Sequence, residues 1–349
     1  MTIAVALATY NGSQFLKEQL RSLLQQTRKP DHVVISDDGS SDATFCIAER
    51  FQRTAPFRVD LLRHRNQQGP MGNFLCAANA CDAEYIAFCD QDDVWLPQKL
   101  ERCEEALRST GSLAVIHSIR HFRTSDTGML FTGGVLVPSR VVDGLQIWPS
   151  EIAPGMSMVV RKEVLKTASE LKALWEPRFD LIAKTRPLSL MDHWSHGHDW
   201  YLFTTVRLSG QLTFLKVILA FHRLHTSNYS SGGSKWSQPK EIEQSWGQGR
   251  NLGYRMLSSF CEDFADMLEG GSSIPLPDQR RRATLEYYRR WAAIWKHRAT
   301  LYSPDFRRSV RATCLFKIVG KRGYHGRYDG GLGMLSLCKD ILNLGYLRP

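Results

Sequence analysis

Residues 3–24, which read IAVALATYNGSQFLKEQLRSLL, contain the first strand and the first helix that the sequence predicts. The apolar run 3–8 has the length and composition of a buried strand. A turn follows at 11–13, and leucines at positions 16, 20, 23 and 24 then share one face of a helix. Pro30 ends this segment. The stretch therefore predicts a strand followed by an amphipathic helix, the opening unit of an α/β fold.

Four further apolar runs, at 32–36, 58–62, 85–89 and 113–118, alternate with stretches of helical period. This alternation is typical of an α/β domain in which helices cover the faces of a mostly parallel sheet. Turn residues at 125–128 make the pattern less regular beyond the last of these runs. We therefore expect a mixed second half of the sheet.

The composition is that of a globular protein. The 349 residues are 43% hydrophobic and 23% charged, and the longest apolar run, 212–221, contains Lys216. A bilayer-spanning helix needs ~20 apolar residues, and this run is shorter. The N-terminus lacks the basic segment of a signal peptide, and the eight cysteines form no CxxC pair. These features predict a cytoplasmic protein without a membrane-spanning helix.

The C-terminal third has a different character. We place a domain boundary at the polar stretch 227–238, which divides the chain into an α/β domain, 1–228, and a mainly helical extension, 229–349. The best helix candidates in the extension are 250–268 and 278–298. The extension carries 20 Lys and Arg against 11 Asp and Glu. This excess suits a nucleic acid, an anionic membrane surface or a phosphorylated acceptor, and a solvated helical face is the alternative.

The first acidic pair, Asp37 and Asp38, follows the strand 32–36 directly. Its carboxylates are therefore expected at the carboxyl end of a sheet strand, where α/β proteins bind ligands. The alternative is a role in capping the next helix. Ser41 or Asp42 explains that cap better, so the acidic pair indicates a binding site.

A second acidic group, Asp90, Asp92 and Asp93, ends the run 85–89 in the same way. Three carboxylates within four residues repel one another unless they share a cation. Oxygen ligands of this kind suit Mg²⁺ or Mn²⁺, which complete their coordination with substrate phosphates and water. Capping of the helix that opens at Pro97 is the alternative, although one carboxylate suffices for a cap.

A third group is His198, Asp199, Trp200 and Tyr201. A carboxylate beside aromatic rings suits contact with a sugar and deprotonation of a hydroxyl. Asp199 is therefore a candidate general base, and its three neighbours are candidates for an acceptor site.

Two further signals are weaker. His193 and His196, together with His198, could bind zinc, but their spacing matches no strong zinc pattern. Arg223 and His225 follow a strand closely enough to contact a diphosphate or a metal.

Taken in order, these motifs resemble the bacterial family-2 glycosyltransferases with the GT-A fold, in particular the rhamnosyltransferase-like group. The matching segments are ALATYNGSQFLKEQLRSLLQQT, VVISDDGSSDAT, GNF, YIAFCDQDDVWLPQKL, HDWYL and HRLHTSN. The resemblance implies an α/β GT-A catalytic domain over 1–228, with a mainly helical C-terminal extension.

The resemblance also implies roles for individual residues. It implies that Asp38 contacts the base or ribose of the nucleotide and that Asp37 supports it. Asp199 takes the position of the catalytic base, and a divalent metal, Mn²⁺ or Mg²⁺, is the cofactor. The residues implied for nucleotide-sugar binding are Thr9, Tyr10, Asn11, Asp37, Asp38, Asn73, Asp90 and Arg223, and those implied for the metal are Asp92 and His225.

The implied reaction moves a sugar, with rhamnose as one candidate, from a nucleotide diphosphate sugar to a hydroxyl with inversion at the anomeric carbon. The implied acceptor is a glycan or lipid-linked glycan in surface polysaccharide synthesis. Two segments depart from the family pattern. Residues 66–74 contain an altered turn, and His198 stands where relatives often have glutamate. The extension matches no known pattern, so the acceptor stays undetermined.

Three alternatives stay open at this point: a binding module resembling receiver domains, an inactive nucleotide-sugar-binding protein, and a nucleic-acid-binding module. The last would use the basic extension, in which arginines at 280–282, 289–290 and 307–308 are interleaved with Tyr287, Tyr288, Trp291 and Trp295. We favour peripheral contact of this basic and aromatic region with a membrane surface, and consider nucleic acid the weaker choice.

Overall fold

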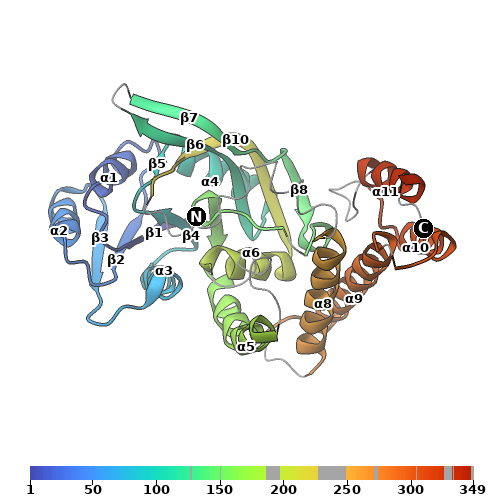
Figure 1. Cartoon of the computed structure of the whole chain (residues 1–349). Coiled ribbons are helices and arrows are strands. Elements are labelled where there is room, and N and C mark those ends of the chain that lie inside the picture. The colour runs from blue at the N-terminus through green and yellow to red at the C-terminus, as the bar shows by residue number, and fades with distance from the viewer. Residues whose placement is uncertain are drawn as a thin grey trace. The chain divides into compact units, whose positions relative to one another are not determined.

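The computed structural model (Figure 1) describes residues 1–125, 128–149, 151–185, 197–226, 249–270, 274–303, 305–325, 332 and 334–346. Two compact units make up the chain. The first comprises 1–141, 152–169 and 196–231, and the second comprises 142–151, 170–195 and 232–349. The proposed linker 227–238 and the histidines at 193 and 196 lie outside the described residues.

The first unit is built on one mixed sheet with the strand order β3-β2-β1-β4-β9-β6-β10-β5. Strands β1 to β4 are mutually parallel, β6 is parallel to β10, and β9 runs antiparallel to both β4 and β6. This confirms the predicted parallel first half and mixed second half. The strands are β1 (Ile3–Thr9), β2 (His32–Asp37), β3 (Arg58–Arg63), β4 (Tyr85–Asp90), β5 (Val94–Trp95), β6 (Ala114–Ser125), β7 (Gly128–Val135), β8 (Arg140–Asp143), β9 (Met158–Arg161) and β10 (Gln211–Arg223).

Helices connect and cover the strands. The described residues form the helices α1 (Leu16–Leu24), α2 (Thr44–Thr54), α3 (Gly69–Ala80), α4 (Lys99–Thr110), α5 (Val164–Thr185), α6 (His198–Ser209), α8 (Gly249–Glu269), α9 (Asp278–Leu301), α10 (Arg308–Gly320) and α11 (Met334–Tyr346). Short 3-10 turns lie at Gly144–Gln146 and Gly155–Ser157.

The central strand β1 is buried along its whole length, as expected of a parallel strand covered on both faces. Ile3, Val5 and Leu7 join a core with the leucines of α1 and the apolar face of α4. The alternating positions are alanines, and α3 packs on β1. The predicted strand and helix at 3–24 are therefore both present.

The register of the parallel strands brings the candidate motifs to one edge of the sheet. Thr9 pairs with Asp37, and Ala8 pairs with Asp90. Because these strands run in the same direction, their carboxyl ends, with the turns that follow them, lie next to one another. The fold thus gathers the first two acidic groups at one location.

The second unit is helical, as predicted, and its core is aromatic. Trp291 stacks on Trp295, and Phe264 stacks on Tyr288, with ring centroids 5.3 and 4.3 Å apart. The aromatic side chains of α9 are buried, namely Tyr287, Tyr288, Trp291 and Trp295. This corrects the expectation that they meet a membrane surface, since their apolar area is already used to pack the helices. Among the described residues, no helix combines the length and the apolar character needed to cross a membrane.

Candidate active site

Asp37 ends β2, and its carboxylate is fully buried. It accepts hydrogen bonds from the Thr9 hydroxyl at 3.0 Å and from the Ser40 amide at 3.0 Å. The hydroxyl of Ser40 donates a further bond at 2.5 Å. Asp37 therefore holds the end of β1 against the turn that follows β2, and its support of a nucleotide contact by Asp38 stays a prediction.

Asp38 connects β2 to the beginning of α3. One of its carboxylate oxygens accepts from the Gln68 amide at 2.6 Å and the other from the Gly69 amide at 3.0 Å. Gly69 has a φ of 71°, a left-handed conformation that favours glycine. The altered turn of residues 66–74 is thus fixed by Asp38. Contact of Asp38 with a base or ribose stays a prediction.

The loop after β1 presents a ring to solvent. Tyr10 is 46% exposed, while its backbone exchanges two hydrogen bonds with the Gln91 side chain, at 2.9 and 3.0 Å. Asn11 has a φ of 46°, and its side-chain oxygen accepts from the Ser41 amide at 2.9 Å. A Cβ at Gly12 would lie 2.0 Å from the Gln91 side-chain oxygen. The loop is therefore rigidly held, with the Tyr10 ring available to a planar ligand.

Gln91 escaped the sequence interpretation because that interpretation concentrated on carboxylates. Gln91 lies between Asp90 and Asp92. Its side chain bonds to Tyr10 in the loop after β1, a residue 81 positions away in sequence. Asn73 was expected near the nucleotide sugar. It is buried beneath the loop, where its amide donates to the Thr9 carbonyl at 3.1 Å, and its contact with a nucleotide sugar stays a prediction.

The acidic group after β4 is electrostatically strained. Burial, followed by the charges of Asp92 and Asp199, raises the pKa of Asp90 to about 8. Burial and the neighbouring carboxylates raise the pKa of Asp93 well above its usual range. Asp93 is satisfied in part by the Arg223 amide, which donates to it at 3.1 Å. A cation at this position would relieve the repulsion.

A buried lysine lies near these acids. Lys99 is fully buried, its ammonium group donates to the Met156 carbonyl at 2.7 Å, and it stands over the Trp95 ring. Its charge interacts favourably with Asp90 and Asp93, although burial lowers the pKa of Lys99 to about 8. A lysine in the first turn of a predicted helix carries no sequence signal of burial, so this residue could not be identified beforehand.

Asp92 and His225 form a partly accessible pair of potential metal ligands. The imidazole Nε2 of His225 lies 2.7 Å from a carboxylate oxygen of Asp92, and the two side chains are 18% and 14% exposed. A carboxylate and an imidazole fit Mn²⁺ or Mg²⁺ if a diphosphate and water supply the remaining ligands. Within the described part of the chain, no group of three or more His, Cys, Asp or Glu side chains is arranged to hold an ion. A substrate phosphate would have to complete such a site.

Arg223 is a structural neighbour of this pair. Its side chain is buried, its Nε donates to the Asp92 carbonyl at 2.8 Å, and its guanidinium also contacts Glu18 and Thr124. The guanidinium carbon of Arg223 lies 4.8 Å from the ring centroid of Phe15 and 4.5 Å from that of Phe122. This geometry favours a role for Arg223 in positioning the loop 90–93. The contact of Arg223 with a diphosphate stays a prediction, and the burial of its side chain does not favour it.

The first turn of α6 carries Asp199. Its carboxylate accepts from the Trp200 amide at 2.9 Å, and a Cβ at Gly197 would lie 2.1 Å from that same oxygen. The ring centroid of His198, next to Asp199, lies 5.7 Å from that of Phe88 in β4, so the third motif lies near the strand that ends at Asp90.

The three neighbours of Asp199 differ from the expectation. His198, Trp200 and Tyr201 are buried, so their rings cannot stack on an acceptor sugar in this structure. His198 stacks on Phe74 with ring centroids 3.8 Å apart, and burial lowers its pKa. The reason is that most residues of α6 are buried, so aromatic side chains near its start serve packing.

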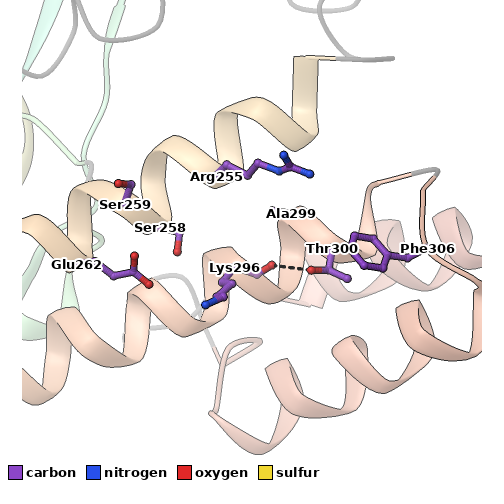
Figure 2. A pocket seen from close by; sticks show the side chains of 8 residues that line it. All are labelled: Arg255, Ser258, Ser259, Glu262, Lys296, Ala299, Thr300 and Phe306. Carbon is purple, nitrogen blue, oxygen red and sulfur yellow. Dashed lines mark hydrogen bonds between the residues drawn. The ribbon is translucent and has the colours of Figure 1, made fainter. Parts of the chain in front are cut away.

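A separate pocket of about 280 Å³ lies in the second unit (Figure 2). It is formed between α8 and α9, with Phe306 at one end, and none of its lining residues was a predicted site residue. Its lining is Arg255, Ser258, Ser259, Glu262, Lys296, Ala299, Thr300 and Phe306.

Comparison with known proteins identifies relatives of this chain. The profile of glycosyl transferase family 2 matches residues 4–167. An uncharacterized glycosyltransferase of Nostoc sp. is 24% identical over 329 residues, which cover 93% of this chain and 95% of that protein. The dTDP-rhamnosyl transferase RfbG of Shigella flexneri is 38% identical over 105 residues, only 29% of this chain and 36% of that protein.

A solved structure shares the fold. The crystal structure of S. aureus TarS 1-349 in complex with UDP-GlcNAc is similar with a TM-score of 0.52 at 16% sequence identity. The similarity covers 99% of this chain and 90% of that chain. At this level of identity the comparison establishes the architecture alone.

Proposed function

We propose that this chain, whose residues 4–167 match the profile of glycosyl transferase family 2, is an inverting transferase that uses a nucleotide diphosphate sugar. The sugar would pass to a hydroxyl of a glycan or lipid-linked glycan, in the cytoplasm or at the inner face of the membrane. Surface polysaccharide synthesis is the process that this reaction would serve.

One observation carries the proposal. Asp90 ends β4, and the ring of Phe88 in that strand has its centroid 5.7 Å from that of His198, next to Asp199 in α6. The charges of Asp92 and Asp199 accordingly raise the pKa of Asp90. A packing role would not place three acids together in a partly buried location, because their repulsion destabilises the fold. A site built to hold a cationic or diphosphate-bearing ligand explains them.

For the donor, we assign the nucleotide to the loop after β1. Thr9, Tyr10 and Asn11 border this loop, and the exposed Tyr10 ring suits contact with a base. Asp38 would act mainly by fixing the beginning of α3, since both of its oxygens accept backbone amides. The diphosphate would then extend toward Asp90 and Asp92.

Asp92 and His225 are the residues that would hold a divalent metal. When bound, Mn²⁺ or Mg²⁺ would neutralise the leaving diphosphate. The pair is accessible, and Arg223 keeps the loop that carries Asp92 in place by its bond to the Asp92 carbonyl. Asp90 would contribute a carboxylate next to the sugar.

Asp199 would act as the general base. It would accept the proton of the acceptor hydroxyl while the oxygen attacks the anomeric carbon and the bond to the diphosphate breaks. The backbone bond from Trp200 and the close approach at Gly197 orient its carboxylate. A single displacement of this kind inverts the anomeric configuration.

The local similarity to a dTDP-rhamnosyl transferase makes dTDP-rhamnose the first donor to test. The experiment incubates the purified chain with nucleotide sugars, Mn²⁺ and a lipid-linked glycan, and NMR then reports the anomeric configuration of the product. We expect an inverted product, and the Asp199→Asn variant should lose about 10²- to 10⁴-fold in turnover while it retains donor binding.

Two results would contradict this assignment. Full turnover by Asp199→Asn would show that another group is the base, and a product with retained configuration would exclude a single displacement. Donor binding without turnover by the unaltered chain on any acceptor would favour an inactive nucleotide-sugar-binding protein.

A further inference from the structure

Helix α11 exposes its apolar stripe. Met334, Leu335 and Ile341 are 66%, 81% and 50% exposed, and Cys338 is exposed as well. Positions 334, 338 and 341 follow the i, i+4, i+7 spacing of one helical face. The opposite side of the helix carries Asp340, which is fully buried and bonded to Arg298 at 2.7 and 3.0 Å. The helix therefore docks through its polar side and leaves its apolar side outside.

Helix α10, which contacts α11, has a similar outer surface. Phe316 is 74% exposed and Val319 is 50% exposed, whereas Ile318 points inward and is fully buried. Phe316 and Val319 are three residues apart and so share a face. We call the exposed apolar residues Phe316, Val319, Met334, Leu335, Cys338 and Ile341 the outer face of α10 and α11.

The surroundings of the outer face are cationic. Lys317 and Lys321 are exposed beside it, together with Arg307, Arg308, Arg322 and Lys339. Among the described residues from 305 to 346, the acids are Asp305 and the buried Asp340. The surface thus combines large apolar side chains with a positive charge that acidic residues hardly offset.

We propose that the outer face of α10 and α11 docks on the surface of an anionic phospholipid bilayer. Such a surface accepts apolar side chains at the headgroup boundary and attracts Lys and Arg at the same time. A nucleic acid would use the charges but leave Phe316 and Leu335 in water. A second copy of this chain would bring two cationic surfaces together, which is unfavourable.

The test is cosedimentation of the full chain with lipid vesicles, without donor or metal. We expect binding to vesicles that contain phosphatidylglycerol, none to pure phosphatidylcholine, and weaker binding at high salt. Each basic residue contributes roughly fivefold in partitioning, so Lys317→Gln/Lys321→Gln should bind roughly 25-fold more weakly. Leu335→Ser/Ile341→Ser should also bind more weakly, because it removes apolar contacts from residues that are already exposed.

The matched control is Arg282→Gln/Lys296→Gln, which removes two exposed charges from α9. It should bind vesicles like the unaltered chain. An equal loss in this control, or unchanged binding by Leu335→Ser/Ile341→Ser, would overturn the proposal in favour of unspecific charge attraction. Absence of binding to anionic vesicles would also overturn it, and a dimer that Leu335→Ser/Ile341→Ser dissociates would assign the outer face to a second copy.

An environment-sensitive dye gives a second measurement. Attached to Cys338 in a Cys46→Ser background, it should shift to shorter wavelength with anionic vesicles. Attached to the exposed Cys46 of α2 in a Cys338→Ser background, it should not shift. Equal responses at the two positions would contradict docking through the outer face. Donor binding measured in parallel separates this result from the proposed transferase function.

Discussion

Replacing Asp38 with asparagine tests how the nucleotide loop is built. The carboxylate is 5% exposed, and its two oxygens accept the amides of Gln68 and Gly69 at 2.6 and 3.0 Å. Asparagine offers one acceptor oxygen, so one amide loses its partner and faces an NH₂ group. A buried hydrogen bond to a charged acceptor contributes about 1.5–3 kcal/mol, and we expect Asp38→Asn to destabilise the chain by an amount in that range.

Two measurements test the loss of stability expected for Asp38→Asn. Urea unfolding gives the change in stability, and hydrogen exchange should show faster exchange of the amides of Gln68 and Gly69. The matched control is Asp42→Asn, because Asp42 also accepts two backbone amides, from Thr44 and Ser13, but is exposed. Its cost should be smaller, since water replaces the lost partner. Equal costs for the two variants, or unchanged exchange at 68 and 69, would refute the account of Asp38.

Two further substitutions address the catalytic edge. Asp90→Asn should stabilise the metal-free chain increasingly as pH rises from about 4 to about 8. Because the pKa of Asp90 is raised in the folded state, the carboxyl is protonated there while it is ionised in the unfolded chain, and the unaltered chain loses stability over this window. Urea unfolding at acidic and alkaline pH checks this, and an equal effect at both would contradict it. Gly155→Ala should reduce turnover, although residue 155 is not proposed to contact the substrate. The new Cβ would lie 2.2 Å from Nε2 of His198, so the start of α6 and with it Asp199 would be displaced. Gly320→Ala, where a Cβ meets nothing within 4 Å, is the control, and equal turnover in the two variants would show that α6 tolerates the shift.

The first half of the fold could be predicted because its signals are local. The apolar runs that became β1, β2, β3 and β4 are short, continuous and separated by helical periods, and parallel strands buried on both faces have this pattern. The beginning of α8 and the approximate length of α9 could likewise be predicted from their helical period. The partner strands β7 and β9 could not be placed, because their pairing with β6 depends on tertiary contacts.

The candidate site was predictable from the sequence where the local pattern decides, since β4 does end at Asp90, as its apolar run indicates, while the roles of these acids stay predictions. It was not predictable where burial decides. Trp200 and Tyr201 look suited to a sugar in sequence, but the position of α6 turns them into the core. Arg223 likewise resembles a ligand for phosphate, yet it is held by Glu18, 205 positions away in sequence.

The most direct test of the central claim is calorimetric titration of the chain with UDP, dTDP and GDP sugars, with and without Mn²⁺. The account predicts that one nucleotide class binds, that binding requires the metal, and that Asp92→Ala removes the metal-dependent part. Binding that is indifferent to both the metal and Asp92, or no binding of any nucleotide sugar, would contradict it.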